Sequence, residues 1–109
     1  ATIETTAPDA PTVVITEDTN NDGTINSSEL SDDINVTISL PTDASAGDIL
    51  TVNGTPHTLT AAEITAEEYP TTFTSPGEGS TLTVTATITN GVGNTSASAS
   101  DAATIETTA

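Results

Sequence analysis

The amino-acid sequence predicts an all-β fold, a sandwich of two sheets built from about seven short strands. Apolar and polar residues alternate along several segments, and Gly and Pro turn signals separate these segments. Alternation with a period of two places one set of side chains inside and the other in solvent, as in a half-buried strand. Strands and turns at this spacing are typical of a two-sheet sandwich.

The clearest strand is expected at residues 80–90, where apolar side chains alternate with threonines. Its inward residues are Leu82, Val84, Ala86 and Ile88. One helical turn is expected at residues 61–68, where the apolar residues do not alternate. Further strands are expected at residues 12–16, 35–40, 49–52, 57–60, 68–74 (interrupted by Pro70) and 96–106.

The charge of the chain is one-sided, with 16 acidic residues, no Lys, no Arg and a formal net charge of −16. Mutual repulsion of these carboxylates opposes folding, and no basic side chain offsets it. The composition therefore predicts either disorder or folding driven by a cation from solution, and the strand patterns favour the second. Nucleic acid is excluded as a partner, since phosphate binding relies on basic groups. No apolar run has membrane-spanning length, so direct membrane insertion is not expected.

A calcium site is predicted at residues 18–29, DTNNDGTINSSE, which fit the loop pattern D-x-[DN]-x-[DN]-G-x5-E at every position. Gly23 permits the sharp turn, and Ile25 is expected to point into the core. A solvated turn rich in Asn and Asp is the alternative. No pair of amphipathic helices flanks the loop, so we expect a calcium loop inserted into a sandwich. The expected ligands are Asp18, Asn20, Asp22, Thr24 (carbonyl), Asn26 (through water) and Glu29 (both oxygens).

The heptapeptide ATIETTA occurs twice, at residues 1–7 and 103–109, a shift of 102 residues from position 1 to position 103. This identity predicts a tandem array whose unit is a whole domain. We expect residues 1–11 to be an inter-repeat linker, 12–105 the domain, and 106–109 the start of the next linker. The prolines of the first linker favour a stiff, extended connection.

A second group of acids is predicted at the junction between repeats. Because chain direction alternates between antiparallel strands, the loops after residues 40 and 90 should return to the end where the chain enters. The acids of those loops and of the entry linker would then bind a calcium ion together. The alternative is that they are ordinary loop acids without a ligand. Glu106, at the exit, is expected near the calcium loop. The expected entry-end residues are Glu4, Asp9, Asp43, Asp48 and Asn94.

No enzymatic activity is expected. His57 is the single histidine and is expected to be an ordinary surface residue, since no catalytic triad can be built around it. A glycosidase carboxylate pair would call for aromatic sugar platforms, and the chain offers only Tyr69 and Phe73. The threonine row of residues 81–89 is either structural or a face that binds ice or a glycan.

Several motifs together resemble one family: TEDTNNDGTINSSEL, VTISLP, AGD, TVNG, LTAAEIT, LTVTATIT, GNTS and TTAPDAPT. They look like the immunoglobulin-like extender repeats of giant bacterial RTX adhesins, most closely those of ice-binding adhesins. The resemblance covers nearly the whole chain. Glu4 and Glu106 depart from it, since the family often has Asp at such linker positions.

The resemblance implies an immunoglobulin-like sandwich that binds several Ca²⁺ ions per repeat, with more at the linkers. It also implies type I secretion, display on the bacterial cell surface, and a rod-like monomeric array whose partners are neighbouring repeats of the same chain. The implied function is a spacer that projects distal adhesion domains, with the alternative of a ligand-binding adhesin module.

Overall fold

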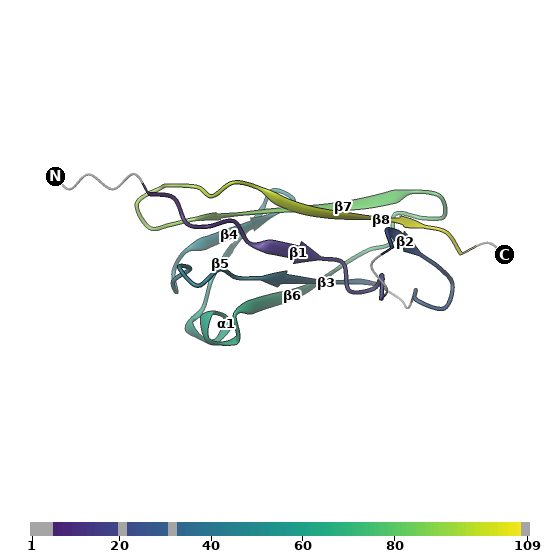
Figure 1. The fold of residues 1–109 in the computed structure, drawn as a ribbon, viewed down its shortest axis with the longest axis horizontal. Helices are drawn as coiled ribbons and strands as arrows, with labels where there is room; N and C mark the ends of the chain where they lie inside the picture. The colour runs from purple at the N-terminus through teal and green to yellow at the C-terminus, as the bar shows by residue number, and fades with distance from the viewer. Residues whose placement is uncertain (1–5, 20–21, 31–32, 108–109) are drawn as a thin grey trace.

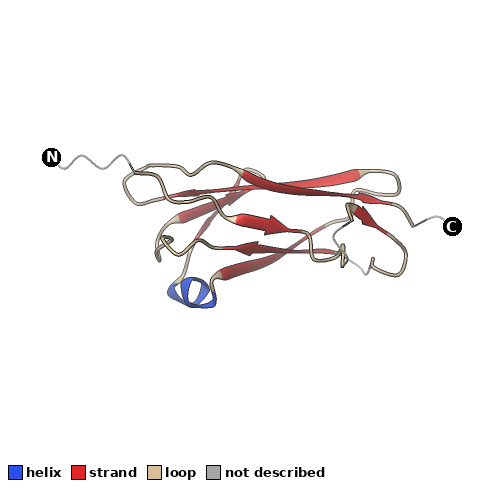
Figure 2. Cartoon of the chain, in the orientation of Figure 1, coloured by secondary structure: helices blue, strands red, loops and turns tan. Residues whose placement is uncertain are grey.

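The computed structural model describes residues 6–19, 22–30 and 33–107, which form two layers of strands (Figure 1). Within these residues the elements are strands apart from a short helix at the edge (Figure 2). The elements are β1 (Thr12–Val14), β2 (Thr24–Ile25), β3 (Ile34–Ser39), β4 (Ile49–Val52), β5 (Thr55–Thr58), α1 (Ala61–Ala66), β6 (Glu68–Phe73), β7 (Thr81–Thr89) and β8 (Ala99–Ile105).

The strands form a three-stranded sheet, β1-β3-β6, and a five-stranded sheet, β2-β8-β7-β4-β5. Neighbouring strands are antiparallel except β2, which lies parallel to β8. The prediction of an all-β, sandwich-like fold with two sheets is therefore confirmed. Strand β2, two residues inside the expected calcium loop, was not predicted because it is too short to show a pattern.

The core lies between the two sheets and is aliphatic. Val36 and Ile38 of β3 and Val84 and Ile88 of β7 are buried, so the faces expected from the alternation are confirmed. Burial of each such side chain stabilises the fold by about 1.5–3 kcal/mol. The aromatic rings of Tyr69 and Phe73 only pack against the margin of this core.

Both prolines found within strands lie in edge strands. Pro70 sits in β6 opposite Thr37, and Pro56 sits in β5 opposite Thr51. An edge position tolerates proline because the missing N–H can face away from the ladder. The expectation that Pro70 interrupts its strand is therefore wrong, since β6 continues through it. The same prolines protect the open edges of the two sheets from pairing with another chain.

Helix α1 begins with a capping box. The Thr60 hydroxyl accepts the Glu63 N–H, and Glu63 Oε1 accepts the Thr60 N–H at 2.9 Å. His57 Nε2 lies 2.9 Å from both Glu63 carboxylate oxygens, and the His57 ring stacks on Tyr69 at 4.4 Å between centroids. His57 therefore differs from the expected surface histidine, because it is half-buried and ties β5 to α1 and β6.

The chain enters and leaves the domain at opposite ends (Figure 1). The principal extents are 61 × 23 × 20 Å, so the domain is elongated along the line that joins its entry and exit.

We expect Glu63→Gln to destabilise the protein in a pH-dependent way. Burial acts to raise the pKa of Glu63, but the Thr60 N–H and His57 outweigh it and leave the pKa below its usual 4.5. A carboxylate whose pKa is lower in the folded state stabilises the fold at pH values above its unfolded-state pKa. This stabilisation is lost as the pH falls through its folded-state pKa. The substitution should therefore cost about 1 kcal/mol near pH 6, as for a lost cap, and less near pH 3.

Urea denaturation at both pH values in constant calcium measures this difference. Glu68→Gln, which removes one exposed carboxylate from β6, is the matched control. An equal loss for Glu63→Gln at both pH values would contradict the proposed stabilisation.

Candidate metal centre

Three acidic side chains of the predicted calcium loop converge at the exit end of the domain. Asp18, Asp22 and Glu29 each offer a carboxylate oxygen, and these oxygens lie within 4.8 Å of one another. We call this group the acid triad. Across the ranges 6–19, 22–30 and 33–107, it is the one group of three metal-ligating side chains that meets this distance. Asp18 is buried at 3 % exposure, Glu29 is half-buried, and Asp22 is exposed.

The buried member of the triad is held by backbone donors from its own loop. The Gly23 N–H donates to Asp18 Oδ2 at 2.8 Å, and the Asp22 N–H donates to Asp18 Oδ1 at 3.3 Å. Gly23 has φ +84°, a left-handed conformation that glycine adopts without strain. The turn that folds the loop back over Asp18 therefore depends on this glycine.

Glu29 closes the loop from its other end. Its Oε2 accepts bonds from the Thr19 N–H and the Thr19 hydroxyl, each at 3.0 Å, while its Oε1 accepts the Asn26 N–H at 3.0 Å. Asn26 Oδ1 accepts bonds from the Ser28 N–H and hydroxyl and from the Glu29 N–H. The Asn26 side chain thus shapes the turn that presents Glu29, and its role as a water-mediated ligand stays a prediction.

The loop is anchored to the sandwich through β2. The Thr104 N–H donates to Gly23 O and the Glu106 N–H donates to Ile25 O, both at 2.9 Å. Ile25 is fully buried, as predicted, while the Thr24 N–H donates to Asp22 Oδ1 at 3.0 Å. Glu106 therefore lies beside the loop through its backbone, but its carboxylate is not part of the acid triad. Asn20 lies outside the described residues.

The electrostatics of the triad favour a bound cation. Burial raises the pKa of Asp18, and the Asp22 carboxyl raises it further, against the lowering effect of the Gly23 and Asp22 N–H groups. The charged form of Asp18 is therefore less favourable than that of an exposed Asp, and the chain has no Lys or Arg to offset it.

Calcium suits this donor set. The ion takes 6–8 oxygen ligands at 2.3–2.6 Å, so two oxygens on one ion lie at most about 5 Å apart. The spacing of the triad oxygens falls within that limit. The triad would supply up to three carboxylates, and Thr24 O, Asn20 and water remain the expected additional ligands.

The other predicted site residues lie at the entry end. The Asp9 N–H donates to both Asp43 carboxylate oxygens, at 3.0 and 3.3 Å. Asp48 is buried and accepts the Ser45 N–H at 3.0 Å, and Asn94 Nδ2 donates to the Thr6 carbonyl at 3.5 Å.

Asp43 and Asp48 line a cavity of about 250 Å³ together with Ser45, Asn90 and residues 6–8, whereas Asp9 and Asn94 do not line it. Within the described part of the chain, Asp9, Asp43 and Asp48 do not bring three carboxylates as close together as the acid triad does. Glu4 lies outside the described residues. Metal binding at the entry end stays a prediction.

Two further carboxylates were not predicted. Glu17 is 5 % exposed, and its Oε1 accepts bonds from Asn35 Nδ2 at 2.8 Å and the Asn35 N–H at 3.4 Å. Asp101 Oδ2 accepts the Ile15 N–H at 3.0 Å. Both contacts join segments distant in sequence, and nothing in the local pattern indicates them.

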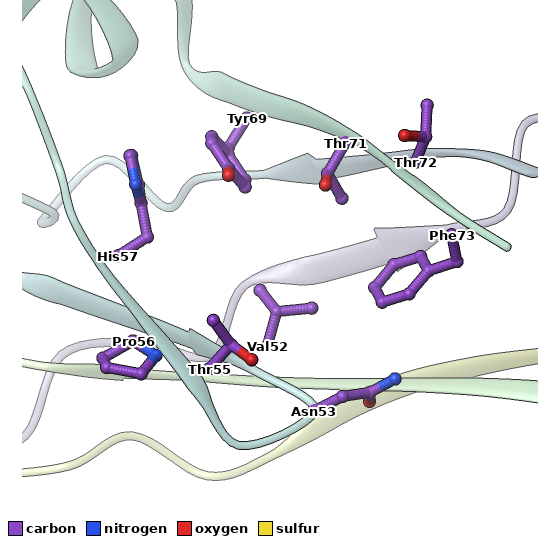
Figure 3. Close-up of a pocket in the computed structure, with 9 residues that line it drawn as sticks. All are labelled: Val52, Asn53, Thr55, Pro56, His57, Tyr69, Thr71, Thr72 and Phe73. Atoms are coloured by element: carbon purple, nitrogen blue, oxygen red, sulfur yellow. The ribbon is translucent and has the colours of Figure 1, made fainter. Parts of the chain in front are cut away.

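A separate cavity of about 370 Å³ opens between edge strands β5 and β6, with His57, Tyr69 and Phe73 in its wall (Figure 3). No residue of the acid triad lines it. His57 is stacked on the ring of Tyr69, so that face of the ring is already covered by the protein.

Some hydroxyls of the threonine row of β7 bond to threonines of adjacent segments. The Thr81 and Thr104 hydroxyls lie 2.8 Å apart, and so do those of Thr89 and Thr95. Hydroxyls at both ends of the row therefore bond to other threonines, which favours the structural interpretation of the row.

No protein-family model, curated protein or solved structure matches the chain. Within the ranges that the structure describes, no helix has the length and apolar character needed to cross a membrane.

We expect Asp18→Asn to have a larger cost in calcium than without it. In excess chelator the substitution relieves the repulsion from Asp22 but also leaves one of the two N–H groups that Asp18 accepts without its acceptor, so the melting temperature should fall only slightly. In calcium it should remove a direct ligand and weaken binding at least roughly tenfold, since even outer-shell changes weaken metal sites by that much. Calorimetric titration and thermal melts measure both effects. An equal loss of melting temperature with and without calcium would show that Asp18 acts through packing alone.

Proposed function

We propose that this chain is a calcium-stabilised, immunoglobulin-like unit of a tandem array that serves as an extracellular spacer. The observation that carries the proposal is the acid triad, formed by residues with calcium-loop spacing in a chain that contains no Lys or Arg. A folded domain with this composition gains stability from a cation that the folded state binds and the unfolded chain does not.

The placement of entry and exit at opposite ends of an elongated domain supports a spacer (Figure 1). Units joined through these ends extend the array by one domain length each, and a repeated heptapeptide at residues 1–7 and 103–109 supports such joining. The array would hold a distal adhesion domain away from a bacterial surface.

Calcium dependence also fits export through a type I secretion channel. Where calcium is scarce, the repulsion among 16 carboxylates would keep the chain unfolded and able to pass through a channel. Extracellular calcium modules bind with Kd of roughly 10⁻⁴–10⁻³ M, so folding would follow in calcium-rich surroundings outside the cell. The acid triad would hold one ion, and the entry-end acids are the place for a further one.

We expect calcium to raise the melting temperature of the isolated unit. A ligand at 10–100 times its Kd stabilises the folded state by about 1.4–2.7 kcal/mol per site. For a domain of this size that corresponds to roughly 6–22 °C. Scanning calorimetry in 10 mM calcium and in excess chelator measures the shift, and magnesium tests selectivity because it demands a stricter octahedral geometry. Identical melts in calcium and chelator would reject calcium as the folding ligand.

We expect Glu29→Gln to weaken calcium binding at least about tenfold, because Glu29 closes the loop. Glu68→Gln removes the same charge from exposed β6 and should leave affinity nearly unchanged. Isothermal titration of both variants separates a specific ligand from general screening. Equal losses of affinity would mean that total charge, and not the acid triad, determines binding. Glu78 is unsuitable as a control, since its carboxylate binds Thr107.

A further inference from the structure

The domain holds its departing chain with one carboxylate. Both Glu78 oxygens accept the Thr107 N–H at 3.0 Å, and Glu78 Oε1 also accepts the Thr107 hydroxyl. The loop that carries Glu78 is shaped by flanking glycines at positive φ, Gly77 and Gly79. The Gly79 N–H donates to Ile105 O at 2.8 Å, which ties the loop to the end of β8. The direction in which the chain leaves the domain is therefore set by hydrogen bonds.

The domain also holds its arriving chain. Nδ2 of Asn90 and Nδ2 of Asn94 both donate to the Thr6 carbonyl, at 3.3 and 3.5 Å. Three residues further on, the Asp9 N–H donates to Asp43, and Pro8 between them is buried. The entry segment thus lies against the domain from Thr6 onward, although its sequence predicts a linker.

The repeated heptapeptide puts these two attachments side by side in an array. With a shift of 102 residues, Thr107 of one unit corresponds to Thr5 of the next, and Thr108 corresponds to Thr6. The residue held by Glu78 of the first unit is then followed directly by the residue held by Asn90 of the second. Two residues of chain span at most about 7 Å, so the two domains must lie close together.

We propose that Glu78 of one repeat and Asn90 of the next form a clamp on the chain that joins the two repeats. No residue of that chain lies between the residue held by Glu78 and the residue held by Asn90. The clamp seats the exit loop of one unit, residues 75–80, against the entry loops of a second copy, residues 42–48 and 90–94. This inference rests on the tandem array of the proposed function but not on calcium, because its contacts are hydrogen bonds to the backbone. Glu78 and Asn90 are positioning residues that fix the angle between neighbouring repeats.

The test is a distance distribution across one junction. The chain contains no cysteine, so spin labels can be placed without background in a protein of two units. Ala102→Cys in the first unit and Ala62→Cys in the second place exposed labels on either side of the junction and outside the loops that the clamp brings together. Double electron–electron resonance in saturating calcium then reports the spread of distances, and thermal melts of the single unit report folding.

We expect a narrow distribution for the parent protein and a broad one for Glu78→Ala in the first unit. Glu106 stays bonded to Ile25, so the substitution releases Thr107 alone and adds excursions on the order of 6 Å. Asn90→Asp in the second unit should broaden it as well. This substitution keeps the oxygen that accepts the Val92 and Asn94 N–H groups, but removes the donor to Thr6. Single-unit melts of both variants should match the parent, and Glu68→Ala should leave the distribution narrow.

Three results would overturn the clamp: a broad parent distribution, an unchanged width in Glu78→Ala and Asn90→Asp, or equal broadening in Glu68→Ala. The calcium proposal fails separately, through a single-unit melt that chelator does not change. A narrow junction in chelator-treated but still folded protein would support the clamp and show that calcium is not its source.

Discussion

Sixteen acidic side chains share this fold without one Lys or Arg, and the structure depends on how their charge is accommodated. Isolated buried carboxylates are costly, so they need hydrogen-bond donors or a cation. The protein supplies donors from its own backbone. Of the buried acids, Asp18 accepts from Gly23 and Asp48 accepts from Ser45. The half-buried Glu29 accepts from Thr19, and the exposed Asp43 and Glu78 accept from Asp9 and Thr107. Each of these bonds fixes a loop or a chain end. The acids whose mutual repulsion opposes folding therefore also hold the loops and chain ends in place.

Backbone donors do not suffice where three carboxylates meet. At the acid triad, Asp18 keeps a raised pKa because of its burial, even though two N–H groups point at it. An oxygen-seeking divalent ion would remove that penalty and would link the loop to β2 and the core through Ile25. The aliphatic core is small and lacks disulfides, so a ligand that stabilises only the folded state has a large relative effect. The proposed spacer function would then follow from an elongated shape that forms where calcium is available.

Sequence patterns predicted the local features well, since period-two alternation marks β3 and β7 and the spacing within residues 18–29 brings three carboxylates together. They missed what depends on distant partners. Strand β2 exists because Gly23 and Ile25 meet β8, and the Glu17–Asn35 and Asp101–Ile15 bonds join separate segments. Pro70 was misjudged because edge position is a property of the sheet. The bond between Glu78 and Thr107 likewise joins residues 29 positions apart.

The most direct measurement of the central claim is a crystal structure of the unit grown in calcium, with an anomalous difference map. The account predicts a peak among Asp18, Asp22 and Glu29, with oxygens of all three at 2.3–2.6 Å from it. It also predicts that Asn20 and Thr24 O complete the coordination. A map with calcium bound elsewhere on the domain and no peak at the acid triad would contradict the account.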